Sequence, residues 1–180
     1  MTIVKKEALI HFGAALFFLL IVSLFKKYFA ISYFGFWLGG ALGTLAPDID
    51  HLLYIYLLKP QEVTSQRVNY MMQKGEILKT FQLMISTRSE RKDLVFHNLL
   101  VQSAFLVLVF WVLSSSGSLL GRGFVLAFAL HLSVDQIVDF LQMDNINNWT
   151  KKLPIELTRE QAALVAISFL VVLSFFALLV

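Results

Sequence analysis

The residues best suited to chemistry are histidines and aspartates that lie within otherwise apolar stretches of the chain. The segment GTLAPDIDHLLYIYLL holds Asp48, Asp50 and His51 at the end of a long apolar run. His131 and Asp135 lie one helical turn apart on one face of a later apolar segment. Ionisable side chains are costly inside a membrane and usually mark a functional site there. Imidazole and carboxylate together are ligands of zinc, iron or manganese. The candidate metal ligands are His11, Asp48, Asp50, His51, His97, His131 and Asp135.

Helices that cross a membrane must position these residues, because the chain is strongly hydrophobic. Of its 180 residues, 58% are hydrophobic and 15% are charged. It has no cysteine, which excludes disulfides and thiolate metal sites. A spanning helix needs about 20 mostly apolar residues. The sequence therefore predicts an all-α fold, a single-domain polytopic membrane bundle (residues 1–180) of about five helices, with four as the alternative. The predicted spans are residues 8–25, 31–58, 94–114, 119–142 and 162–180.

The distribution of lysine and arginine predicts the orientation of this bundle. With five spans, twelve of the fifteen basic residues fall on one side of the membrane. The positive-inside rule then places the N-terminus and the loop 59–93 in the cytoplasm. The net charge of +3 reflects these basic loops, so no nucleic-acid partner is expected. Apolar residues recur at near-helical spacing in the loop, which predicts a helix on the cytoplasmic surface. All four histidines would fall in the same leaflet.

A histidine and aspartate cluster of this kind would suit a hydrolase that uses one or two metal ions. Two ions about 3.5–4 Å apart can bridge a hydroxide and clamp a phosphoester. A carboxylate that is not a ligand could act as the general base, and Asp50 and Asp139 are the candidates. Arg88, Arg91 and Lys92 border the predicted site and could hold a phosphate. The bilayer would then deliver a phospholipid-like substrate at the cytoplasmic leaflet.

Pro47 indicates that the second predicted span is not a regular helix. Proline removes one backbone hydrogen bond and clashes with the preceding turn, so a kink or local unwinding is expected. A kink here could turn Asp48, Asp50 and His51 towards one cavity. The glycines in WLGGALG, just before it, permit close contact between helices.

Three other residues have simple structural interpretations. Asn98 could cap the helix that follows it. Asp139 could pair with Lys151 instead of acting in catalysis. Trp149 fits an anchor at the membrane interface.

The order of the motifs resembles a bacterial and archaeal family of LexA-regulated inner-membrane proteins that are predicted to be metal-dependent hydrolases. The matching segments are ALIHFGAALF, LAPDIDHLL, LVFHNLL and HLSVD, within the first 140 residues. Where that family reads His-Arg-Gly before its second histidine, this chain reads Lys92-Asp93-Leu94, so a ligand or a phosphate contact is replaced. The family is similar in ligand pattern to zinc-dependent phospholipase C and P1-type nucleases. The resemblance implies zinc, a phosphoester substrate and the prokaryotic inner membrane.

Two alternatives to a hydrolase stay open. Intramembrane histidine and aspartate are also typical of metal or proton transporters. A transporter predicts ionisable groups through the whole membrane depth, but in the predicted topology only Arg122 lies in the outer half. The second alternative is a non-catalytic membrane protein with a structural metal, which the lost His-Arg-Gly element favours.

Overall fold

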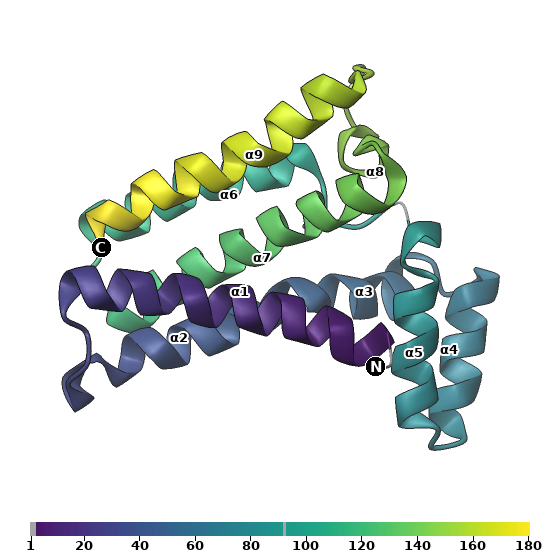
Figure 1. The fold of residues 1–180 in the computed structure, drawn as a ribbon. Coiled ribbons are helices and arrows are strands. Elements are labelled where there is room, and N and C mark those ends of the chain that lie inside the picture. The colour runs from purple at the N-terminus through teal and green to yellow at the C-terminus, as the bar shows by residue number, and fades with distance from the viewer. Residues whose placement is uncertain (1–2, 92) are drawn as a thin grey trace.

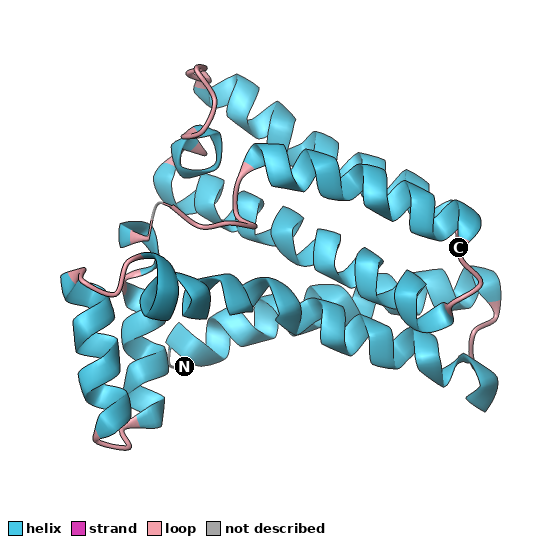
Figure 2. Cartoon of the chain, turned by 180° about the vertical axis from the view of Figure 1, so that it is seen from behind, coloured by secondary structure: helices cyan, strands magenta, loops and turns pink. Residues whose placement is uncertain are grey.

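A computed structural model of the chain describes residues 3–91 and 93–180, and these residues form helices joined by turns and loops, without strands (Figure 2). The predicted all-α fold is therefore confirmed. The helices are α1 (Ile3–Lys26), α2 (Phe34–Leu45), α3 (Ile49–Leu53), α4 (Val63–Gln73), α5 (Ile77–Ser86), α6 (Leu99–Ser115), α7 (Leu119–Met143), α8 (Asn147–Thr150) and α9 (Arg159–Phe176). Single helical turns lie at Ile31–Tyr33, Ala46–Asp48, Tyr54–Leu58, Arg88–Glu90 and Ala177–Leu179.

The central helix of the bundle is α7. It runs between α1 and α2 on one side and α6 and α9 on the other, and it contacts all four (Figure 1). Most of α7 is buried, whereas only 28% of the apolar window of α1 and 22% of that of α9 are buried. Large exposed apolar surfaces of this kind are typical of a membrane-facing protein.

Within the described residues, three helices are long and apolar enough to cross a membrane: α1 over Leu9–Lys26, α7, and α9 with its last turn, to Leu179. They correspond to the first, fourth and fifth predicted spans. Helix α6 is shorter, with 17 residues, and the second predicted span is divided into short helices. Membrane association is therefore supported, while the count of five spans and the cytoplasmic N-terminus stay predictions.

The helix that carries the PDIDH motif is irregular, as Pro47 predicts. Helix α2 passes into a 3₁₀ turn at Ala46–Asp48, then into α3, and ends in a π turn at Tyr54–Leu58. A 3₁₀ turn advances each side chain by about 120°, against about 100° in an α-helix. The directions in which Asp48 and Asp50 point are therefore not those of a continuous helix.

Helices α2 and α7 touch backbone to backbone. A Cβ atom built on Gly39 would lie 2.0 Å from the carbonyl oxygen of Leu120, and one on Gly43 would lie 2.2 Å from that of Phe124. On the facing helix, a Cβ on Gly123 would lie 2.0 Å from the carbonyl oxygen of Phe36. Only glycine permits this separation, so the predicted role of the glycines in close helix contact is confirmed.

The loop 59–93 forms a helical hairpin of α4 and α5 that stands across one end of the bundle (Figure 1). One surface helix was expected here, but the chain reverses between two helices. Gly75 adopts a left-handed conformation at the turn, with φ of 72°, which ends α4 as in a common helix C-cap. Helix α5 contacts α1, near the N-terminus of the chain.

Candidate metal centre

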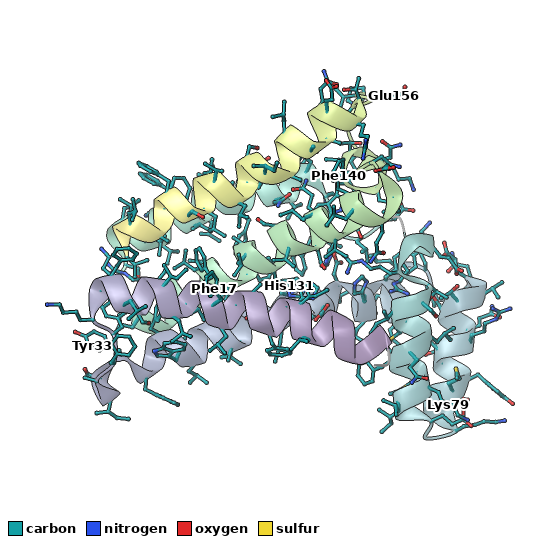
Figure 3. All side chains as sticks on the ribbon, viewed as in Figure 1. Phe17, Tyr33, Lys79, His131, Phe140 and Glu156 are labelled. Carbon is teal, nitrogen blue, oxygen red and sulfur yellow. The ribbon has the colours of Figure 1, made fainter. Side chains whose placement is uncertain are left out.

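His131 lies on α7 in the interior of the bundle, and its ring is fixed by a backbone carbonyl (Figure 3). Its Nδ1 is 2.6 Å from the carbonyl oxygen of Thr44. A carbonyl can only accept, so Nδ1 carries a proton, and whenever the ring is neutral its lone pair is on Nε2. This buried Nε2 makes no hydrogen bond of acceptable geometry with the described residues. A buried imidazole held in this tautomer by a carbonyl is the usual arrangement of a metal ligand.

Asp135, one turn further along α7, is the carboxylate at which three histidines converge. Its Oδ1 lies 2.7 Å from His11 Nε2 of α1. Its Oδ2 lies 2.8 Å from His97 Nε2, in the loop before α6, and 3.2 Å from His131 Nε2. The Asp135 side chain is 1% exposed. Four groups from distant parts of the sequence therefore meet inside the bundle.

His11, His131 and Asp135 form a group that could hold a metal ion, because one ligand atom from each lies within 4.8 Å of the other two. We call these three residues the ligand cluster. The rings of His11 and His131 are 4.3 Å apart between centroids. Donor atoms of a four-coordinate zinc lie about 2.0–2.1 Å from the ion and thus about 3.3 Å from one another. His11 Nε2 and His131 Nε2 lie 2.7 and 3.2 Å from oxygens of Asp135, and all three ligand atoms lie within 4.8 Å of one another, so the side chains would move to surround an ion.

His97 is oriented by Asp50, which lies just outside the ligand cluster. Asp50 accepts hydrogen bonds from the backbone N–H groups of Val95, Phe96 and His97, at 2.8, 2.6 and 3.2 Å. His97 Nδ1 is 3.1 Å from the same carboxylate. With Nδ1 donating to Asp50, the other ring nitrogen of His97 faces Asp135. Asp50 is therefore placed as a support for a ligand, with its oxygens engaged by the 95–97 loop.

Asp48 and His51 lie beside the ligand cluster. Asp48 Oδ1 is 3.7 Å from His131 Nε2, and the Asp48 side chain is 58% exposed. His51 stacks on His97, and its Nδ1 accepts a hydrogen bond from Arg91 Nε at 3.2 Å. The kink was expected to turn both aspartates and His51 into one cavity. Instead, Asp48 and His51 line one cavity and Asp50 faces the 95–97 loop.

Asp139, expected either as a general base or as a partner of Lys151, takes part in a different network. Its Oδ1 lies 3.2 Å from Arg88 Nε, and its Oδ2 accepts a hydrogen bond from Trp149 Nε1 at 2.8 Å. Arg88 also contacts Asp135 Oδ1 through Nη1, at 2.8 Å. Trp149 is 1% exposed, so the prediction of an interfacial anchor is wrong. The indole serves to hold Asp139 against the guanidinium.

The other expected phosphate-binding residues differ in their surroundings. Arg91 is buried, and it donates to the Met84 carbonyl, to Thr87 and to His51. Burial lowers the pKa of Arg91 to about 10, so it stays charged at neutral pH. Lys92 lies outside the described residues. Asp93, a possible replacement for the family's ligand, is half-exposed and pairs with Lys151 at 2.5 Å.

Two cavities lie near the ligand cluster. The first, of about 280 Å³, is lined by Arg88, His97 and Asp139 and by polar residues near α8, and we call it the polar cavity. The second, of about 350 Å³, lies between α1, α5 and the PDIDH helix, and we call it the apolar cavity. It is lined by His11, Asp48 and His51 together with mainly apolar side chains. The ligand cluster thus borders the apolar cavity through His11, and the polar cavity lies beyond His97 and Arg88.

Two groups that shape the site were not identified from the sequence. The Thr44 carbonyl that fixes His131 is a backbone atom, and no residue type signals it. Trp149 was taken for a membrane anchor, although its position ten residues after Asp139 allows the two side chains to meet across a turn. By contrast, Asn98 accepts from the Val101 N–H at 3.0 Å, so the prediction that it caps its helix is confirmed.

Comparisons of the chain with models of protein families, with curated proteins and with solved structures give no match.

Proposed function

We propose that the chain is a membrane-embedded, metal-dependent hydrolase that acts on a phosphoester. The observation that carries the proposal is the lone pair of His131 Nε2, which is buried, fixed by the Thr44 carbonyl and directed to Asp135. A buried imidazole nitrogen without a hydrogen bond is unfavourable unless a cation or a proton donor completes it. The resemblance to membrane-bound hydrolases points to zinc and to the prokaryotic inner membrane.

The residues around the ligand cluster have complementary roles in this proposal. A divalent ion held by His11, His131 and Asp135 supplies Lewis acidity and activates water. Asp50 holds the His97 ring in position through Nδ1. Arg88 is the group best placed to contact a phosphoryl oxygen, because it borders both cavities and also contacts Asp135 of the ligand cluster.

Asp48 is the carboxylate best placed to accept a proton. The oxygens of Asp50 are engaged by backbone N–H groups, and those of Asp139 by Arg88 and Trp149. Asp48 is half-exposed in the apolar cavity, 3.7 Å from His131 Nε2. We therefore assign the general-base role to Asp48, in place of Asp50 or Asp139.

The cavities favour a catalytic over a structural metal. Structural zinc sites are closed by four protein ligands, whereas catalytic sites keep a position open for water or substrate. The ligand cluster has three residues, and a cavity of about 350 Å³ borders it at His11. A substrate atom can therefore approach the ion.

Metal analysis of the purified protein tests the first half of the proposal. We expect about one or two zinc ions per chain in the wild type and a loss of metal in His131→Ala and Asp135→Asn. Asp144→Asn is the matched control, because Asp144 is an exposed carboxylate that pairs with Arg159 and should retain the metal. Unchanged metal content in both cluster variants would contradict the proposal.

Turnover of phosphoesters by the metal-loaded protein tests the second half. Phospholipids, alkyl phosphates and nucleotide esters would be screened for metal-dependent hydrolysis. Asp48→Asn should lower turnover by about 10²–10⁴-fold, the usual effect of removing a general base. A tightly bound metal with no turnover of any ester class would instead support a structural metal site.

A further inference from the structure

The two cavities beside the ligand cluster meet at one wall and differ in character. Both are lined by Ile85, Arg88 and Arg91, at the end of α5 and in the turn that follows. The ligand His11 borders the apolar cavity, and His97 borders the polar one. The charged side chains of Arg88 and Arg91 therefore lie at the boundary between the apolar cavity and the polar cavity.

The apolar cavity opens sideways, towards the surface that α1 presents to a membrane. Its apolar lining comes from three elements: Phe12 of α1, Leu45, Ile49 and Leu52 of the PDIDH helix, and Phe81 and Met84 of α5. The first five of these side chains are between 45% and 51% exposed. Exposed apolar side chains around an opening in a candidate membrane span give a hydrocarbon chain access from the bilayer.

The polar cavity has a different rim. Ser86, Gln142 and Asn148 line it together with Arg88 and Asp139. Ser86 and Gln142 are exposed, and these residues lie at the end of the bundle where the α4–α5 hairpin and α8 stand (Figure 1). A hydrated group can therefore be accommodated here without desolvation.

We propose that the ligand of this site is an amphiphile with one hydrocarbon chain and one phosphate. The chain occupies the apolar cavity, the phosphate lies at Arg88 beside the ligand cluster, and any polar group beyond the phosphate enters the polar cavity. The apolar cavity, at about 350 Å³, is near the lower end of the range of ligand pockets, about 300–1,000 Å³, so it suits one chain and not two. The inference rests on the proposed function, whose substrate it specifies.

Charge adds a condition to this binding mode. Four carboxylates lie in or beside the cluster, and two guanidinium groups oppose them; they are Asp48, Asp50, Asp135, Asp139, Arg88 and Arg91. A divalent ion would add positive charge beside Arg88 and so strengthen the attraction of a phosphate. The hydrocarbon chain carries no charge, so the metal should act through the headgroup, and removal of the metal should lower the occupancy of the whole ligand.

Photo-crosslinking of the full chain in lipid nanodiscs tests the inference. The probe is a hydrolysis-resistant alkylphosphonate. We choose a chain of twelve carbons that carries a diazirine at its end. In zinc-loaded protein we expect crosslinks at the residues of the apolar cavity, chiefly Leu52, Phe81 and Met84. Crosslinks spread evenly over lipid-facing residues such as Phe17 and Leu164, both exposed on outer helices, would overturn it.

Two tryptophan variants make the test specific. Leu52→Trp fills the cavity and should lower specific labelling by about tenfold or more. Leu57→Trp is the matched control, because Leu57 lies on the same irregular helix, is 71% exposed and does not line the cavity. Equal labelling in the two variants would overturn the inference.

The same samples separate failure of this inference from failure of the proposed function. If zinc is bound and esters are hydrolysed but the cavity is not labelled, the amphiphile inference is overturned and the hydrolase stands. If the wild type binds no metal, the proposed function fails, and the inference built on it is overturned with it. Labelling of the cavity that falls when a chelator removes zinc supports both.

Discussion

The two sides of the candidate metal centre are held in different ways. On one side, α2 and α7 touch through their backbones, and His131 of α7 contacts the Thr44 carbonyl of α2, next to this contact. On the other side, the turn after the α4–α5 hairpin reaches the site through the side chains of Arg88 and Arg91. The positions of the metal ligands thus depend on a fixed separation of α2 and α7. The hairpin side supplies positive charge through long side chains, which can change conformation. A substitution can therefore change the geometry of the metal ligands without changing the contacts to a bound substrate, and the reverse also holds.

The α2–α7 contact explains how a backbone atom can fix a ligand. The Thr44 carbonyl that accepts from His131 Nδ1 follows Gly43, the residue packed against the Phe124 backbone. Any increase in the separation of the two helices lengthens the 2.6 Å contact between Thr44 and His131. The tautomer of His131 is thus coupled to the absence of a side chain on the neighbouring glycines.

We expect the largest effect from Gly123→Ala, which alters the backbone contact between α2 and α7. Its Cβ would lie 2.0 Å from the Phe36 carbonyl oxygen, so the helices must separate, at a cost of about 3 kcal/mol or more. We expect a lower free energy of unfolding together with a loss of bound metal. Both are measurable by thermal unfolding in detergent and by metal analysis.

Gly13→Ala is the matched control for this variant. Gly13 lies within α1, and a Cβ there meets no atom within 4 Å. Alanine should be neutral, or stabilising by up to about 1 kcal/mol, because it favours the helix. Equal metal content in the two variants would show that helix separation does not control the ligands.

The sequence predicts the helices better than the side-chain directions. The apolar runs identify α1, α7 and α9, because hydrophobic length alone defines a candidate span. The four-residue spacing of His131 and Asp135 places both on one face of α7, since a long regular helix leaves no other choice. The convergence of His11 and His97 on Asp135 agrees with a topology inferred from lysine and arginine positions.

The sequence does not predict side-chain directions and contacts at the places where a regular helix is interrupted. Asp48 and Asp50 are two residues apart, and the 3₁₀ turn at Pro47 decides which of them faces His131. The division of 59–93 into two helices depends on the conformation of Gly75, which apolar spacing does not encode. The pairing of Arg88 with Asp139 requires the hairpin to fold back across the bundle, a tertiary event without a local signal.

We expect a smaller effect on stability and on zinc affinity from Asp50→Asn, which lies between the α2–α7 side and the hairpin side of the site. An amide has one acceptor oxygen, and its NH₂ group would face donors that now contact a carboxylate, among them the N–H of Phe96. The loss of these contacts should cost about 1–3 kcal/mol in unfolding free energy. The loss of support for His97 should weaken zinc binding by about 10–100-fold.

Competition with a chelator of known affinity measures the zinc affinity of Asp50→Asn. Asp144→Asn again serves as the control, since it makes the same chemical change at an exposed position. A complete loss of zinc in Asp50→Asn alone would identify Asp50 as a direct ligand. An unchanged affinity would remove the supporting role that we assign to it.

The smallest effect is expected at Asp93, which connects the hairpin side of the site to the turn after α8. The hydrogen bond from Lys151 lowers the pKa of Asp93 below its ordinary value of 3.8. Because this pKa is lowered in the folded state, the pair stabilises the protein above pH 3.8 and loses its effect as the pH falls through the lowered value. The side chain is 38% exposed, so Asp93→Asn should cost less than about 1 kcal/mol. Thermal unfolding at pH 7 and pH 3 tests this: the difference between wild type and variant should shrink at pH 3, with zinc affinity at pH 7 unchanged. A difference that persists in acid, or a loss of zinc at pH 7, would show that this distant side of the molecule also sets the geometry of the metal centre.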